Sequence, residues 1–141
     1  MGLGMCSDDL DGLVEIGHGQ FGVVYIGAAK KIVPGQSETR VAVKTLADTS
    51  EAARAEFDGE AKIMKAIDNN NVVRLLGLCT DKAPLYMIME FMAKGDLKGF
   101  LRDNRPKRAR ETTLSLRQLA IMGAGVANGM GYLAKMHIVH R

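Results

Sequence analysis

The sequence has no tryptophan, only 5% aromatic residues and only three prolines. Its two cysteines, Cys6 and Cys79, stand far apart and form no Cys-x-x-Cys pair, so neither a disulfide scaffold nor a zinc site is predicted. No apolar run approaches the length of about 18 residues that a membrane-spanning helix needs. These absences exclude small disulfide-rich domains, proline-rich linkers and integral membrane segments from the candidate classes.

The composition that is present is typical of a globular domain, with 47% hydrophobic and 25% charged residues. The net charge of +3 is too small to predict nucleic-acid binding without a clustered basic face. Five basic residues do gather in one stretch, and we interpret that stretch as a solvated loop rather than a polyanion site. They are Arg102, Arg105, Lys107, Arg108 and Arg110.

The order of apolar patterns predicts five strands with one helix after the third strand, followed only by helices. The strands are expected in residues 13–26 (two strands around a glycine-rich turn), 40–46, 72–78 and 85–91, and the helices in 48–67, 95–103 and 114–136. Apolar residues at helical spacing predict a buried face on the last helix. They are Leu119, Met122, Val126, Met130 and Leu133. The predicted fold class is α+β.

A glycine-rich stretch, Gly17-His18-Gly19-Gln20-Phe21-Gly22, has the GxGxxG spacing of phosphate-binding loops. A dinucleotide-binding fold needs a helix directly after the glycines. Here they are followed by Val23-Val24-Tyr25-Ile26, whose side chains favour a strand. The stretch therefore favours a hairpin loop that covers phosphates with its backbone amides, and a plain glycine-rich hairpin remains the alternative.

Lys44 ends the stretch Val41-Ala42-Val43-Lys44 on the third predicted strand. A lysine on a strand is most often simply solvated. Ala42 and Lys44 point to the same face, however, and the small Ala42 side chain leaves room for a flat ligand beside the ammonium group. Lys44 is therefore a candidate to bind phosphate oxygens.

Glu60 falls on the same stripe of its predicted helix as the apolar residues Phe57 and Met64. Its carboxylate is therefore expected to point inward. An inward carboxylate without a cationic partner would destabilise the fold by several kcal/mol. Lys44 is the predicted partner, because its strand immediately precedes this helix.

Together these motifs resemble the first half of a protein kinase catalytic domain of the tyrosine-kinase, receptor type. Further stretches match that family in order: Val72-Val73-Arg74-Leu75-Leu76-Gly77, Met89-Glu90-Phe91-Met92, Gly95-Asp96-Leu97, Gly129-Met130-Gly131-Tyr132-Leu133 and Ile138-Val139-His140-Arg141. The resemblance implies a protein-kinase-like fold and a partial kinase domain over residues 1–141. Residues from about 10 to 91 would form a five-stranded antiparallel N-lobe, and residues 92–141 the hinge and the first helices of the C-lobe.

The resemblance also implies an ATP site, in which Lys44 holds the α- and β-phosphates and Glu60 orients Lys44 as the catalytic pair. Gly17, Gly19, Phe21 and Gly22 would cover the phosphates, Ile16, Val24 and Ala42 would enclose the adenine, Met89 would be the gatekeeper, Glu90 and Met92 would bind the adenine edge, and Asp96 would reach the ribose.

The implied activity is transfer of the ATP γ-phosphate to protein tyrosine, with Mg²⁺, on the cytoplasmic side of a receptor in the plasma membrane. The sequence ends at Arg141, one residue before the catalytic Asp that the resemblance implies, and the Mg²⁺ ligands would also lie further on. We therefore expect no metal ligand and no kinase activity in this fragment alone. The alternative is a receptor pseudokinase acting as a binding or scaffold module. Expected partners are ATP and tyrosine-containing proteins, with no nucleic acid, and contact with a membrane only through a receptor segment outside this chain.

Overall fold

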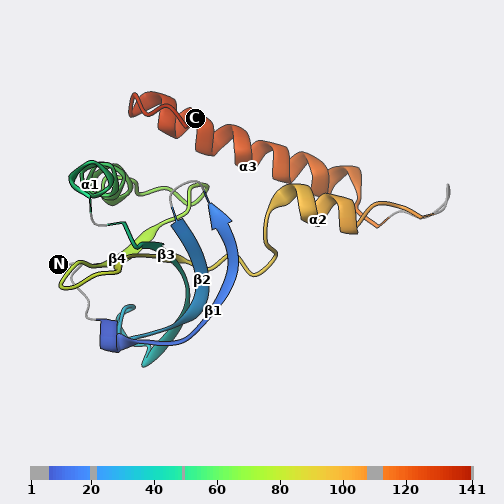
Figure 1. Ribbon diagram of the computed structural model, residues 1–141. Helices are drawn as coiled ribbons and strands as arrows, with labels where there is room; N and C mark the ends of the chain where they lie inside the picture. The colour runs from blue at the N-terminus through green and yellow to red at the C-terminus, as the bar shows by residue number, and fades with distance from the viewer. Residues whose placement is uncertain (1–6, 20–21, 49, 108–112, 141) are drawn as a thin grey trace. The chain divides into compact units, whose positions relative to one another are not determined.

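The computed structural model describes residues 7–19, 22–48, 50–107 and 113–140 (Figure 1). A short 3-10 helix, η1 (Ser7–Asp9), leads into the strands. The elements that follow are β1 (Leu10–Gly19), β2 (Gly22–Lys30), β3 (Glu38–Leu46), α1 (Glu51–Lys65), β4 (Leu75–Cys79), β5 (Leu85–Glu90), α2 (Leu97–Asp103) and α3 (Leu116–Lys135). This order of elements is the one that the apolar patterns predict.

The strands form one sheet in the order β1-β2-β3-β5-β4, and every neighbouring pair is antiparallel. The predicted α+β class with a five-stranded antiparallel sheet is therefore confirmed. β1 carries two register shifts against β2, between Asp11 and Val14 and between Glu15 and Gly17. Such bulges increase the local twist, and β1 and β2 curve strongly in the ribbon view (Figure 1).

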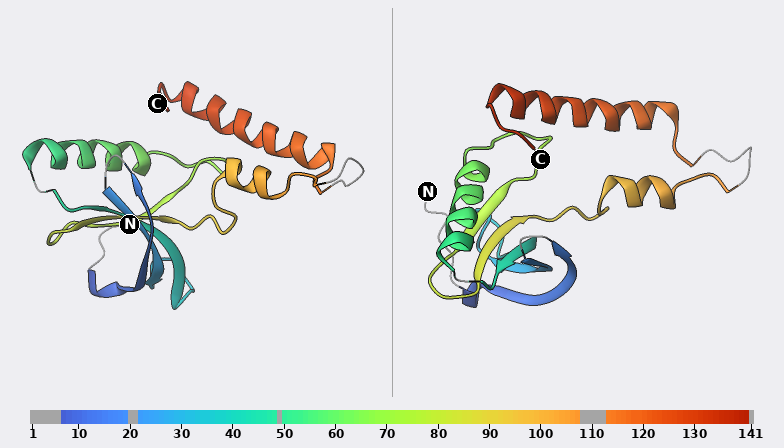
Figure 2. Two further views of the ribbon diagram at one scale, coloured as in Figure 1. Left: turned by 45° about the vertical axis from the view of Figure 1, so that its right-hand side comes forward. Right: turned by 45° about the horizontal axis from the view of Figure 1, so that its top comes forward.

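α1 begins where the sequence offers a capping residue. The Ser50 hydroxyl accepts a hydrogen bond from the Ala53 amide at 3.3 Å, and the Asp48 carboxylate in turn accepts one from the Ser50 amide at 2.8 Å. Such a cap satisfies amides that have no partner inside the helix. The helix then runs along the sheet in contact with β3 and β4 (Figure 2).

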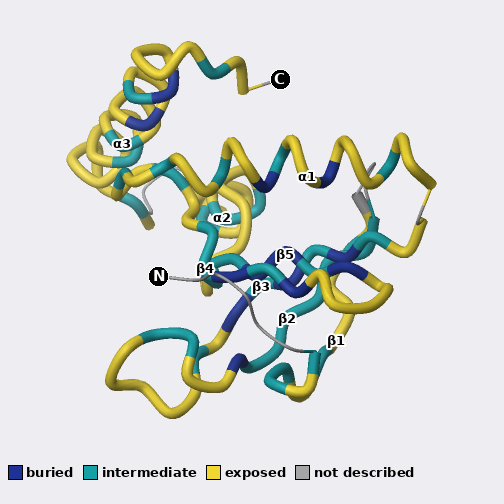
Figure 3. The backbone as a smooth tube through the Cα atoms, turned by 90° about the vertical axis from the view of Figure 1, so that its left-hand side faces the viewer, coloured by how far each residue is buried: buried dark blue, intermediate teal, exposed yellow. Residues whose placement is uncertain are grey.

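The sheet has an apolar core on each of its faces, because neighbouring strand residues point to opposite sides. One cluster contains Ala29, Val41, Val43 and Ile88. The other joins Leu85 and Met87 of β5 to Phe57 and Ala61 of α1. The buried residues of the sheet and of α1 appear together in dark blue in Figure 3. Cys79, predicted as a small buried hydrophobic residue, is fully buried.

The chain divides into two compact units, one of residues 1–68 and 73–91, the other of residues 69–72 and 92–141. The first unit holds the sheet and α1, and the second holds α2 and α3. α3 starts at a capping box, in which Ser115 and Gln118 satisfy each other's backbone amides. The apolar face predicted for this helix is buried only at Leu133 among these positions, whereas Leu119, Val126 and Met130 are exposed.

Among the described residues, no helix combines the length and the apolar character that crossing a bilayer requires.

Candidate functional site

Lys44 of β3 and Glu60 of α1 form an ion pair in the first unit. The Lys44 Nζ atom lies 2.7 Å from Oε1 and 2.6 Å from Oε2 of Glu60, so it donates to both carboxylate oxygens. The Lys44 side chain is only 15% exposed and that of Glu60 37%. The pairing predicted from the helical stripe and the order of the elements is therefore confirmed.

Packing on either side of Glu60 explains why the carboxylate reaches the lysine. Phe57 and Ala61 are buried against the sheet, at 5% and 4% exposure. They fix the rotation of α1, and Glu60 shares their side of the helix. Charge-assisted hydrogen bonds to both oxygens then hold the ammonium group in one place.

A hollow of about 340 Å³ opens beside this ion pair. Gly22 lines it from the glycine loop, Lys44 and Leu46 line it from β3, and Glu56, Phe57 and Glu60 line it from α1. The glycine loop, the strand lysine and the helix glutamate, each predicted from a different motif, therefore line the same hollow. Lys44, which lines the hollow, is oriented by the Glu60 carboxylate.

The glycine stretch connects the antiparallel strands β1 and β2, and Gly19 at the end of β1 pairs with Gly22 at the start of β2. The predicted strand–turn–strand arrangement is therefore confirmed, and no helix follows the glycines. Gly22 has a φ of +134°, and a Cβ atom there would lie 2.0 Å from the Thr45 carbonyl oxygen. Only glycine fits that approach. Gly17 instead borders open space, and Phe21, predicted for the loop tip, lies outside the described residues.

The sheet face next to Lys44 is apolar and partly open. Ala42 pairs with Ile26 on one side and with Met89 on the other, while Lys44 pairs with Val24. Directly paired residues of antiparallel strands point to the same face, so these five side chains share one side of the sheet. Ile16 of β1, within the second register shift, is 56% exposed.

Sequence reasoning missed two residues of this face, Val14 and Ile26. Val14 pairs with Ile26 and is 60% exposed. The alternation that starts at Val24 could have indicated Ile26. Val14 could not be placed, because the register shifts of β1 are not readable from the sequence.

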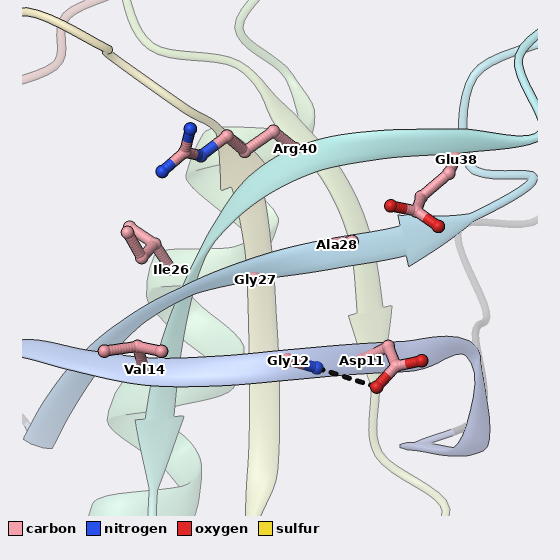
Figure 4. Close-up of a pocket in the computed structure, with 8 residues that line it drawn as sticks. All are labelled: Asp11, Gly12, Val14, Ile26, Gly27, Ala28, Glu38 and Arg40. Carbon is pink, nitrogen blue, oxygen red and sulfur yellow. Dashed lines mark hydrogen bonds between the residues drawn. The ribbon is translucent and has the colours of Figure 1, made fainter.

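The same face continues into a second hollow of about 410 Å³, shown in Figure 4. Val14, Ile26 and Ala28 form its apolar part, and Arg40, paired with Ala28, borders it from β3. The carboxylates of Asp11 and Glu38 lie at the far end in Figure 4, away from the Arg40 guanidinium. That guanidinium lies over the Phe91 ring, 4.7 Å from its centre. This hollow was not predicted.

The remaining predicted binding residues lie at and beyond the end of β5. Glu90 is the last residue of β5 and belongs to the first unit, whereas Met92 and Asp96 belong to the second. Met92 is 46% exposed. The Asp96 carboxylate caps α2 by accepting a hydrogen bond from the Gly99 amide at 2.8 Å. This capping use of Asp96 was not anticipated from the sequence.

One carboxyl group outside the site has a clearly shifted pKa. The Cys79 thiol donates a hydrogen bond to the Asp81 carboxylate at 2.8 Å, and this bond holds the pKa of Asp81 below its usual range. Backbone amides and the nearby charge of Lys82 lower it further. Within the described ranges, no group of three or more His, Cys, Asp or Glu side chains is arranged to hold a metal ion.

The family model described as protein tyrosine and serine/threonine kinase matches residues 10–141. The chain belongs to this family. The resemblance drawn from the glycine loop, Lys44, Glu60 and the later motifs is thereby confirmed. The sheet with α1 corresponds to a kinase N-lobe, and α2 and α3 to the start of a C-lobe.

The similar kinase-family proteins include several receptors. The chain is 43% identical over 141 residues to the insulin receptor of Xenopus laevis, covering 95% of this chain and 10% of that receptor. It is 44% identical over 131 residues to the insulin-like growth factor 1 receptor of Bos taurus, covering 90% and 20% respectively. It is 38% identical over 135 residues to the high affinity nerve growth factor receptor of Rattus norvegicus, covering 90% and 17%. The chain thus spans a fifth or less of these relatives.

Proposed function

We propose that this chain is the ATP-binding part of a protein tyrosine kinase. The observation that carries the proposal is the Lys44–Glu60 pair, with Nζ 2.7 Å and 2.6 Å from the two carboxylate oxygens, beside a glycine hairpin and an open apolar sheet face. An ammonium group held in this way neutralises phosphate charge without reorganisation when the nucleotide arrives. Membership of the kinase family supports the same assignment.

The adenine would lie against the face formed by Ile16, Val24 and Ala42, with Met89 as the gatekeeper behind it. Two features of the face support this placement. Ala42 is a small residue between Ile26 and Met89, so a flat ring can approach the sheet there. Ile16 is 56% exposed, which leaves apolar surface for a ligand to cover.

The triphosphate would follow the hairpin toward Lys44. A Cβ atom at Gly17 would meet no described residue within 4 Å, so a phosphate can approach the backbone at this position. Gly19 and Phe21 are assigned to the same loop, and Gly22 lines the hollow beside Lys44. Backbone groups of Glu90 and Met92 are assigned to the adenine edge and Asp96 to the ribose.

When bound, ATP would supply the activated γ-phosphoryl group, and Mg²⁺ would neutralise phosphate charge. The part of this chain is to bind and orient the nucleotide: Lys44 holds phosphate oxygens and Glu60 fixes Lys44. The catalytic Asp and the Mg²⁺ ligands of a kinase are assigned to sequence beyond Arg141, so residues 1–141 alone would bind ATP without transferring phosphate. The positive charge of Lys44 suits the phosphates of ATP better than it suits a metal ion.

Tyrosine-containing proteins are the proposed substrates, and a receptor the proposed parent, because the similar proteins are named as receptors for insulin, insulin-like growth factor 1 and nerve growth factor. The domain would then lie on the cytoplasmic side of the plasma membrane. A receptor pseudokinase would share the fold without the transfer of phosphate.

The test is binding and turnover measured together. A fluorescent ATP analogue should bind residues 1–141 and be displaced by ATP, and a kinase domain that continues past Arg141 should phosphorylate a tyrosine peptide. Nucleotide binding without turnover in the longer chain would support the pseudokinase. Failure of ATP to displace the analogue would contradict the proposed function.

A further inference from the structure

Glu90 and Arg74 make reciprocal contacts at one end of the sheet. The Glu90 amide donates to the Arg74 carbonyl oxygen at 3.1 Å. In return, the Arg74 amide donates to the Glu90 carboxylate, at 2.8 Å from Oε1. The Arg74 guanidinium adds a longer contact, with Nε 3.8 Å from Oε2.

The two hydrogen bonds close a small ring between the chain just before β4 and the last residue of β5. The β4–β5 ladder begins with Leu75 opposite Met89, so the Arg74 amide stands one residue before the first pair. The Glu90 carboxylate satisfies that amide in place of a ladder partner. On its other side Glu90 pairs with Val41 of β3. The Glu90 backbone is thus tied to both neighbouring strands where β5 ends.

We propose that the Glu90 carboxylate is a positioning group, which fixes the backbone from which the adenine edge is bound by accepting the Arg74 amide. This inference rests on the proposed function, because it concerns the same nucleotide site. It adds a role for the side chain of Glu90 beside the role proposed for its backbone. The carboxylate acts through the main chain of residue 74 and does not need the arginine side chain.

The charge and burial of these groups indicate that the bond from the Arg74 amide to the Glu90 carboxylate matters more than the contact of the guanidinium. A carboxylate that accepts an amide hydrogen bond is a stronger partner than a neutral oxygen. The Glu90 side chain is 27% exposed, so water competes only partly for its oxygens. The Arg74 side chain is 54% exposed, and its contact is at 3.8 Å, a geometry that contributes little in solution. Fixing a binding group in advance raises affinity, because less freedom is lost on binding.

Three variants and a control separate the two contacts in residues 1–141. Glu90→Ala removes the acceptor, Glu90→Gln keeps an acceptor oxygen, and Arg74→Met removes the guanidinium but leaves the amide. Glu38→Ala is the matched control, since Glu38 is an exposed strand glutamate on β3. Two quantities are measured for each: hydrogen exchange of the amide of residue 74 by NMR, and the Kd of a fluorescent ATP analogue.

Glu90→Ala should accelerate exchange at residue 74 and weaken the analogue about tenfold, which corresponds to about 1.4 kcal/mol. In Glu90→Gln the exchange rate at residue 74 and the Kd of the analogue should both stay within about twofold of the unsubstituted chain. Arg74→Met and Glu38→Ala should also change neither quantity by more than about twofold. If Glu90 only stabilised the sheet, Glu90→Ala would unfold the sheet. Exchange would then be faster throughout β4 and β5 and not at residue 74 alone.

Two results would overturn the inference. Unchanged exchange at residue 74 in Glu90→Ala would show that the carboxylate does not hold that amide. Faster exchange with an unchanged Kd would show that the contact exists but does not position the nucleotide site. If the unsubstituted chain binds no analogue, the proposed function fails. This result can be distinguished from a missing carboxylate contact, because exchange at residue 74 would still respond to Glu90→Ala.

Discussion

Lys44 is a charged side chain on an apolar face of the sheet, and Glu60 is the group that stabilises it there. Removing one member of a part-buried pair leaves the other without its counter-charge, so the two residues depend on each other. The position of the Lys44 ammonium is set by two hydrogen bonds of 2.7 Å and 2.6 Å. At the residue scale, the proposed activity depends on this one position.

Lys44→Met should therefore lower phosphate transfer by at least about a hundredfold in a kinase domain that contains this chain. The Kd for ATP should rise by less than about tenfold, because the adenine contacts are assigned to other residues. Transfer of radiolabelled phosphate to a tyrosine peptide measures the first effect, and titration with a fluorescent analogue the second. Lys62→Met, at an exposed position of α1, is the control. Undiminished transfer in Lys44→Met would contradict the assignment.

Removing both Lys44 and Glu60 should cost little more activity than the worse of the two single changes. Residues that act as a unit are non-additive in this way. The measurement is a double-mutant cycle with Lys44→Met, Glu60→Gln and the double variant, using the same phosphate-transfer assay. Losses that simply multiply would show that the two residues act independently, despite the ion pair.

Asp81 predicts a pH dependence of stability. The folded pKa of Asp81 is lowered, first by the Cys79 thiol, so the carboxylate stabilises the fold above the unfolded pKa of 3.8. That contribution is lost as the pH falls through the lower, folded pKa. Urea unfolding should show Asp81→Asn less stable than the unsubstituted chain at neutral pH, with the difference shrinking at acidic pH. Asp58→Asn on α1 serves as the comparison, and a difference that grew on acidification would contradict this account.

At the scale of elements, close approach of backbone segments decides where glycine is needed. In the second unit, a Cβ atom at Gly129 of α3 would lie 2.6 Å from the Asn71 carbonyl oxygen. A Cβ atom at Gly123, on the same helix, would meet nothing within 4 Å. The two glycines share a helical backbone but differ in their surroundings, so they should respond oppositely to the same substitution.

Gly129→Ala should lower the free energy of unfolding by about 1–2 kcal/mol, because the clash outweighs the gain in helix propensity. Gly123→Ala should raise it by about 0.5–1 kcal/mol, since alanine restricts the unfolded chain and fits the helix. Urea denaturation of both variants measures the difference. Equal stabilisation by both substitutions would show that Asn71 does not pack closely on α3.

The sequence predicts those elements whose patterns are local. Val23 and its neighbours show that a strand follows the glycines, and the helical stripe through Phe57 shows that Glu60 points inward. Long-range consequences are not readable in this way. The register shifts of β1 determine where Val14 lies, and the use of the Glu90 carboxylate depends on how β4 meets β5. Periodicity predicts the apolar stripe of α3, but it does not say which of its residues a covering surface buries, and Leu133 is buried while Val126 is exposed.

At the scale of the whole molecule, the first unit brings together the glycine hairpin, the Lys44–Glu60 pair and the apolar face. This unit belongs to a kinase-family chain that spans a fifth or less of the receptors it is similar to. The apolar face and the ion pair lie on the same side of one sheet, so their proposed roles can be tested with a single ligand. The proposed ligand is ATP.

The most direct measurement is the affinity of residues 1–141 for a fluorescent ATP analogue, compared between Ala42→Leu and Ala28→Leu. Both alanines face the same side of the sheet, but Ala42 lies between Ile26 and Met89, whereas Ala28 pairs with Arg40. We expect the analogue to bind and to be displaced by ATP. Its affinity should be at least about tenfold weaker in Ala42→Leu and within about twofold of the unsubstituted chain in Ala28→Leu. Equal affinity in the two variants, or binding that ATP does not displace, would contradict the proposed function.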